Sequence, residues 1–297
     1  MNRWVGILFS VIFFTSALTT VGCTEGNKSS ERLDVTVSIP PQQWIVEQIG
    51  GANVRVNCLL RPGSDPENQE PSIRQMADMK DSQIYFTLGG LPFEEAIIDR
   101  MRANMPHLLI SDTSDGMEKL SDEAHCGSHE GHSHHHESFD PHIWTSLENC
   151  RVMAANVEKA LSNIDPENAQ KYNAAFLKTD SILSAYDREI KNRLDNCKKR
   201  TFMAWHPSLG YFARDYRLHQ ISVQQSDKEV SPRQLAKAID HAREERPVVL
   251  FYDIAQQGNE TSLLSSDLGL PVCPLRLMDY LFIEQLLNAA SAISSHQ

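Results

Sequence analysis

The 297-residue chain is short of positive charge: 28 lysines and arginines stand against 39 aspartates and glutamates, a formal net charge of −11. Nucleic-acid binding needs a positive field that displaces counterions, so this balance argues against it. The six cysteines contain no Cys-x-x-Cys pair, which argues against a zinc finger or a thioredoxin-type site. Neither a His-Glu-x-x-His motif nor a nucleophile elbow is present, so no hydrolase signature is found.

Histidine, in contrast, is abundant, and half of the 12 histidines lie in one short run: His125, His129, His132, His134, His135 and His136. The run contains glycine and serine and has no apolar periodicity, so residues 125–137 are predicted to form a surface loop. Imidazole is the commonest metal ligand, and this density suits Zn²⁺, Ni²⁺ or Cu²⁺. We expect the loop to collect metal ions weakly, because it lacks the rigidity of a specific site.

The N-terminus predicts export from the cytoplasm. Arg3 is followed by a short apolar run, so residues 1–22 are interpreted as a secretory signal peptide. The small residues before Cys23 have the form of a bacterial lipoprotein processing site, and Cys23 is the expected lipidation site. Residues 23–34 would then be a polar tether. The alternative is a membrane-spanning anchor, since the uncharged stretch 4–22 is long enough to cross a bilayer.

Strand-like and helix-like segments alternate in both halves of the chain. Strands are predicted at 33–38, 54–60, 83–88, 108–110, 201–205, 220–224, 248–252 and 270–274. Helices are predicted at 44–49, after Ser72, at 93–101, at 210–216, after Ser231 and at 280–293. Such alternation is typical of α/β domains with mostly parallel sheets. We therefore predict an N-terminal α/β lobe at 35–164, which includes the histidine loop, and a C-terminal α/β lobe at 199–297.

A short internal repeat supports two similar lobes. Ser72-Ile-Arg-Gln-Met-Ala resembles Ser231-Pro-Arg-Gln-Leu-Ala, and each serine is followed three residues later by a glutamine, as in a capping box. Between the lobes, residues 165–198 have apolar residues at spacings of three and four and no internal glycine or proline after Pro166. This segment predicts one helix of about 30 residues, roughly 45 Å long, that joins the lobes.

Lipidation of Cys23 leaves five cysteines, an odd number that cannot all pair within one chain. A Cys197–Cys273 bridge is one pairing open to a protein in an oxidising compartment, but the sequence does not establish connectivity.

Candidate metal ligands lie in three ordered turns. His142 lies in Asp-Pro-His-Ile-Trp (140–144), where proline fixes the backbone and two apolar residues pack the segment down. His206 directly follows a predicted strand, at the strand end where open α/β sheets bind ligands. Either histidine could instead be a packed core residue. The third turn, 62–71, offers the oxygen donors Asp65, Glu67 and Glu70.

Two further acids, Asp253 and Asp279, follow later strands of the second lobe. Asp279 is equally suited to cap the last helix.

The order of these motifs resembles that of the solute-binding lipoproteins of zinc and manganese ABC importers. The resemblance runs from about residue 33 to the C-terminus. It rests on Pro-Gly-Ser-Asp-Pro with Glu-Pro-Ser (62–66 and 70–72), on 140–144, on His206 before Gly-Tyr-Phe-Ala (210–213), and on the histidine loop before Asp140.

The resemblance implies two α/β lobes bridged by a long helix, with one metal ion held in the cleft. It places the ligands at Glu67, His142, His206 and a C-terminal acid, for which Asp279 is the first choice and Asp253 the alternative. It further implies a monomer without enzymatic activity that is anchored in the periplasm or at the cell surface and delivers its ion to a membrane permease.

Glu67 stands where members of this family usually have histidine. Two imidazoles with two carboxylates form a harder donor set, which favours Mn²⁺ or Fe²⁺, although Zn²⁺ accepts both ligand types. Because the histidine loop favours zinc, Zn²⁺ is the expected ion and Mn²⁺ the alternative. Binding should weaken as the pH drops through roughly 6, since imidazole must be neutral to bind.

Three other functions remain open from the sequence. They are a secreted metal-dependent hydrolase that uses His142, His206 and Asp279, a metal buffer whose main site is the loop, and a binding protein for an organic ligand such as a siderophore.

Overall fold

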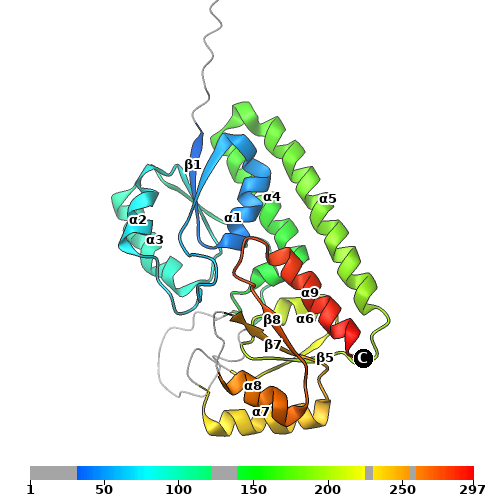
Figure 1. The fold of residues 1–297 in the computed structure, drawn as a ribbon. Coiled ribbons are helices and arrows are strands. Elements are labelled where there is room, and N and C mark those ends of the chain that lie inside the picture. Colours follow the sequence, from blue (N-terminus) through cyan, green and yellow to red (C-terminus); the bar gives the residue numbers. More distant parts are fainter. Residues whose placement is uncertain (1–31, 122–138, 225–229, 255–258) are drawn as a thin grey trace, which may run out of the picture. The chain divides into compact units, whose positions relative to one another are not determined.

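The computed structural model describes residues 32–121, 139–224, 230–254 and 259–297 (Figure 1). The predicted signal peptide 1–22, the lipidation site Cys23 and the histidine loop 125–137 lie outside the described residues. So does the predicted tether, except for its last residues: the first strand already begins at Leu33. In the part of the chain that is described, no helix is both long and apolar enough to cross a membrane.

The first lobe is built on a four-stranded parallel sheet with the order β2-β1-β3-β4. Its strands are β1 (Leu33–Val37), β2 (Val54–Cys58), β3 (Ile84–Thr87) and β4 (Leu109–Asp112). All four residues of β3 are buried, as expected for a central strand covered on both faces.

The second lobe repeats this arrangement. Its four-stranded parallel sheet has the order β6-β5-β7-β8, with β5 (Thr201–Ala204), β6 (His219–Ser222), β7 (Leu250–Asp253) and β8 (Val272–Leu275). The strand after the first strand is at the edge in both sheets. Both predicted capping boxes are present, at Ser72 with Gln75 and at Ser231 with Gln234. The prediction of two similar α/β lobes with parallel sheets is confirmed.

The helices of the first lobe are α1 (Pro40–Gly50), α2 (Ile73–Ala77), α3 (Pro92–Asn104) and α4 (Leu147–Ile164). Those of the second lobe are α6 (Gly210–Asp215), α7 (Pro232–Glu245), α8 (Asn259–Leu268) and α9 (Phe282–Ser295). Helices α4 and α8 are additional to the predicted elements.

A long helix, α5 (Ala169–Leu194), follows the first lobe and confirms the predicted linking element. It has 26 residues, fewer than the predicted segment 165–198, because Pro166–Asn168 forms a separate 3-10 turn and the helix ends at Leu194. Helix α5 packs against α1 and α4 of the first lobe and against α9 of the second (Figure 1). It therefore contacts helices of both lobes.

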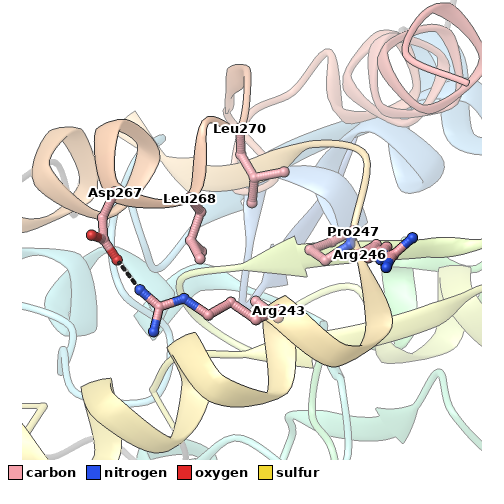
Figure 2. A pocket seen from close by; sticks show the side chains of 7 residues that line it. Arg243, Arg246, Pro247, Asp267, Leu268 and Leu270 are labelled. Atoms are coloured by element: carbon pink, nitrogen blue, oxygen red, sulfur yellow. Dashed lines mark hydrogen bonds and ion pairs between the residues drawn. The ribbon is translucent and has the colours of Figure 1, made fainter.

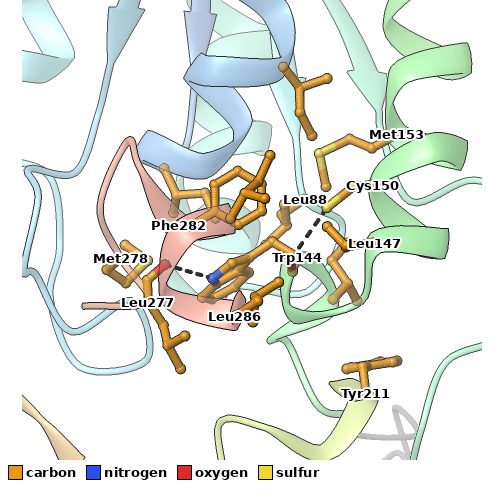
Figure 3. Packing of buried hydrophobic residues seen from close by; sticks show 14 of the residues in the cluster. Leu88, Trp144, Leu147, Cys150, Met153, Tyr211, Leu277, Met278, Phe282 and Leu286 are labelled. Carbon is orange, nitrogen blue, oxygen red and sulfur yellow. Dashed lines mark hydrogen bonds between the residues drawn. The ribbon is translucent and has the colours of Figure 1, made fainter. Parts of the chain in front are cut away.

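Trp144, two residues beyond His142, lies among buried hydrophobic side chains that include Leu277 and Phe282 (Figure 3). Its side chain is fully buried, and its indole Nε1 donates a hydrogen bond of 3.0 Å to the carbonyl oxygen of Leu277, in the loop between β8 and α9. The carbonyl oxygen of Trp144 in turn accepts a hydrogen bond of 3.3 Å from the buried thiol of Cys150 on α4. The turn that carries His142 is thus fixed to both lobes.

The cysteines of the described residues, Cys58, Cys150, Cys197 and Cys273, are all free thiols. The Cys197–Cys273 disulfide that the sequence left open is therefore not formed. Cys197 is buried just beyond the end of α5, where its Sγ contacts the carbonyl oxygen of Arg193 at 3.7 Å.

Candidate metal centre

Glu67 lies in the turn between β2 and α2. Asp65 shapes this turn: its Oδ1 accepts hydrogen bonds from the backbone N–H groups of Glu67, at 3.0 Å, and Asn68, at 3.3 Å. Gly63 precedes it with a φ of 75°, a left-handed conformation that favours glycine, and its N–H donates to the carbonyl oxygen of Met278. The Pro-Gly turn thus holds Glu67 in place and contacts the second lobe.

His142 is buried, with 4% of its surface exposed, in the turn before a short 3-10 helix (Ile143–Thr145). Oδ1 of Asp140 accepts a hydrogen bond of 2.9 Å from the backbone N–H of His142 and lies 2.8 Å from its ring Nδ1. A carboxylate on one ring nitrogen fixes the tautomer and leaves the other nitrogen, Nε2, available to a metal ion. Asp140 is a functional residue that the sequence did not single out.

The motif Gly-Tyr-Phe-Ala at 210–213 supports Asp140 from the second lobe. A Cβ atom on Gly210 would lie 2.7 Å from Oδ2 of Asp140, so the position has no room for a side chain. The phenol of Tyr211 donates a hydrogen bond of 2.8 Å to the carbonyl oxygen of Asp140. The motif therefore acts on His142 through Asp140.

His206 lies two residues beyond the end of β5, with 8% of its surface exposed. Its Nε2 lies 3.3 Å from Nε2 of His142 and 3.3 Å from Oε2 of Glu67. One ligand atom from each of these three residues lies within 4.8 Å of the others. Two of the residues come from the first lobe and one from the second, so an ion bound here would contact both.

The surroundings of His142 set its charge. Burial alone lowers the pKa of its imidazole, but the hydrogen bond and charge of Asp140 and the charges of Glu67 and Asp65 outweigh burial and raise the pKa to about 9. Without an ion, His142 is therefore protonated at neutral pH. Competition between proton and metal ion at His142 then begins well above the pH of roughly 6 that the sequence predicts.

A cavity of about 250 Å³ opens on His142 and His206. Its lining includes His142, His206, Asp65, Leu277, Met278 and Asp253, the last residue of β7. Asp279 is not one of these lining residues, nor is it in the three-residue cluster. Its Oδ1 accepts a hydrogen bond of 3.2 Å from the N–H of Leu281, in the turn before α9. The structure thus brings together three of the four predicted ligands, and of the two C-terminal acids that the sequence offers, Asp253 lines the same cavity.

The chain is similar to known metal-binding proteins over most of its length. The family model described as "Zinc-uptake complex component A periplasmic" matches residues 35–285. The "High-affinity zinc uptake system protein ZnuA" of Bacillus subtilis is 22% identical, over 90% of this chain and 86% of its own length. The "Zinc-binding lipoprotein AdcA" of Streptococcus pneumoniae is 24% identical over 94% of this chain, which spans only 56% of that lipoprotein.

Solved structures show the same fold. A crystal structure of ZnuA has a TM-score of 0.80 and 30% identity, over 90% of this chain and 99% of the other. A manganese-bound mutant of a periplasmic metal binding protein from Candidatus Liberibacter asiaticus has a TM-score of 0.76 over 89% of this chain and 99% of the other. At 20% identity, that second structure shows a common fold alone.

Proposed function

We propose that this chain captures Zn²⁺ outside the cytoplasm and delivers it to an ABC importer, because it belongs to the family of the periplasmic zinc-uptake complex component A. Members of this family are metal-binding, solute-binding proteins and not enzymes. The chain is accordingly an extracytoplasmic metal-binding protein, and a hydrolase built on His142, His206 and Asp279 is not proposed further.

The cluster of Glu67, His142 and His206 is the observation that carries the proposal. Two ligands at 2.0–2.1 Å from a tetrahedral Zn²⁺ are separated from each other by about 3.3–3.4 Å. The separations of His206 Nε2 from His142 Nε2 and from Glu67 Oε2 are both 3.3 Å. The two separations from His206 Nε2 therefore match those of zinc ligands, and the three donor atoms lie within 4.8 Å of one another. A bound ion would add a connection between the two lobes that the empty protein lacks. We propose that the permease distinguishes the loaded from the empty protein by this connection.

Two similar proteins support zinc over manganese. The relative from Bacillus subtilis is named for zinc uptake, and a deletion mutant of ZnuA, 30% identical to this chain, is described with zinc bound. The ion carried by this chain is settled by elemental analysis of the protein purified from its native host, where zinc is expected.

Asp253 is proposed as the fourth ligand, because it ends β7, the neighbour of the strand that leads to His206. Four protein ligands close a tetrahedral shell and leave no position for an activated water. We expect Asp253→Asn to weaken Zn²⁺ binding at least tenfold, measured by competition with a chromophoric chelator. Asp279→Asn is the matched control and should change affinity less than twofold. A larger loss of affinity in Asp279→Asn than in Asp253→Asn would instead identify Asp279 as the fourth ligand.

Replacement of Glu67 tests both its role and the ion preference. We expect Glu67→His to raise the preference for Zn²⁺ over Mn²⁺ at least tenfold, because imidazole is a softer ligand than carboxylate. Competitive zinc and manganese titrations measure this ratio. Glu70→His, in the same turn but exposed, is the control. An unchanged ratio in Glu67→His would show that Glu67 does not bind the ion.

The membrane location is proposed from the N-terminal sequence. Removal of residues 1–22 and lipidation of Cys23 would hold the monomeric protein at the membrane next to its permease, and the relative AdcA is itself named a lipoprotein. Mass spectrometry of the mature N-terminus tests this: a diacylated Cys23 supports the lipid anchor, and an intact residue 1 contradicts it in favour of the membrane-spanning alternative.

A further inference from the structure

A second cluster of metal-ligating side chains lies on the surface of the second lobe. His219 is the first residue of β6, and His241 and Glu245 lie four residues apart on α7. The carboxyl ends of the parallel strands lead to the cleft, as β5 does to His206, whereas His219 is at the amino end of its strand. The cluster therefore lies at the amino ends of the strands, and the cleft lies at their carboxyl ends.

The geometry of this cluster is a looser version of the cleft geometry. Nδ1 of His219 is 3.8 Å from Oε2 of Glu245. The rings of His219 and His241 meet edge to face, with centroids 6.0 Å apart and planes inclined at 64°. For His142 and His206 in the cleft, the corresponding values are 5.1 Å and 68°. The surface cluster has the same three donor types, but its rings lie about 0.9 Å farther apart than the cleft pair. Unlike those of the cleft residues, its donor atoms do not all lie within 4.8 Å of one another, so its side chains must rotate to share an ion.

The helix presents both of its ligands on one face. Residues four apart lie one above the other on an α-helix, so His241 and Glu245 point the same way, towards His219. Arg243, two residues from each, is on the other side of the helix, where its guanidinium donates a hydrogen bond of 3.1 Å to Asp267 on α8 (Figure 2). This positive charge is therefore paired and directed away from the cluster.

The side chains also have freedom to rotate, since those of His219 and Glu245 are 54% and 45% exposed. We propose that His219, His241 and Glu245 bind a second divalent ion of the Zn²⁺, Ni²⁺ and Cu²⁺ class. Two imidazoles and one carboxylate are a zinc ligand set with one position open to water. Because exposed side chains must be ordered on binding, this site is weaker than the cleft site.

The experiment uses the full chain, titrates Zn²⁺ alone and reads each histidine separately. Histidines are modified with diethyl pyrocarbonate at increasing Zn²⁺, and peptide mass spectrometry quantifies each position. We expect His219 and His241 to become protected together, at a Zn²⁺ concentration above the one at which competition with a chromophoric chelator shows that the cleft site is filled. The exposed His107 and His296 are internal controls that should stay reactive. Equal behaviour of His219, His241 and these two controls would overturn the proposal.

Variants separate this site from the cleft. Glu245→Gln should raise the Zn²⁺ concentration for half-protection of His219 and His241 at least tenfold, whereas Glu244→Gln, the adjacent exposed residue, should leave it unchanged. Alanine at both His142 and His206 should also leave it unchanged, so failure of the cleft proposal would not affect this one. Circular dichroism checks that each variant is folded. Loss of protection in the cleft variant, or equal effects of Glu244→Gln and Glu245→Gln, would refute an independent site.

Discussion

Replacement of both His142 and His206 with alanine is expected to abolish tight metal binding, although the six histidines of residues 125–137 remain in the chain. The two imidazoles lie 3.3 Å apart, are nearly completely buried and come from different lobes. Their removal takes away two buried donors whose ring nitrogens already lie next to each other. We expect an affinity loss of at least about a thousandfold, on the order of 4 kcal/mol. Competition with a chromophoric chelator measures it.

Deletion of residues 125–137 is the converse experiment, and it separates capture in the cleft from a metal buffer. We expect one tightly bound ion per chain to survive the deletion, counted by elemental analysis after dialysis, while weakly bound ions are lost. His107→Ala combined with His296→Ala is the matched control for the double variant, since it removes two exposed histidines outside the cleft. Loss of all tight binding on deletion would show that the loop is the main site.

Local sequence signals were sufficient for most of the fold. Ser72 and Ser231 form their capping boxes because serine, the following turn and a glutamine three residues later are all the motif needs. Helix α4 has comparable signals that were not interpreted: Ser146 caps it, and its buried residues Cys150, Met153, Val157 and Leu161 recur at spacings of three and four.

The site was harder to predict than the fold because it depends on which strands are neighbours. His142 and His206 stand out in the sequence, since one follows a proline and the other follows a predicted strand. The choice between Asp253 and Asp279 depends on the order β6-β5-β7-β8, which places the end of β7 beside the end of β5. Asp140 likewise appears in the sequence as part of a turn, and only the structure shows its carboxylate 2.8 Å from Nδ1 of His142.

The apparent affinity for Zn²⁺ is expected to rise about tenfold between pH 7 and pH 8, and by about fivefold more between pH 8 and pH 9. The metal-free pKa of His142 is raised to about 9, so over this range the ion must displace one proton from the ring. Calorimetry in buffers of different ionisation enthalpy should count close to one proton released from His142 at pH 7.

The raised pKa of His142 also makes the stability of the metal-free protein depend on pH. Because the folded pKa lies above the unfolded value near 6.5, the stabilisation is complete below about pH 6.5 and disappears as the pH rises through 9.

Asp140→Asn tests the origin of this behaviour, because Asp140 supplies both a hydrogen bond and a charge that raise the pKa of His142. Without these two contributions, burial lowers the pKa of His142. The apparent Zn²⁺ affinity of the variant should therefore depend less on pH between 7 and 9. At pH 10, above the raised pKa of His142, where the proton hardly competes, we expect the variant to bind Zn²⁺ about 10–100-fold more weakly, since the imidazole has lost its orienting carboxylate. At pH 7 the loss of Zn²⁺ affinity should be smaller, because His142 is protonated in a smaller fraction of the variant molecules. Asp115→Asn, at an exposed residue, is the control for a change of charge alone. Parallel pH profiles for the native protein and Asp140→Asn would contradict the role of Asp140, because an amide cannot hold the proton on His142 as a carboxylate does.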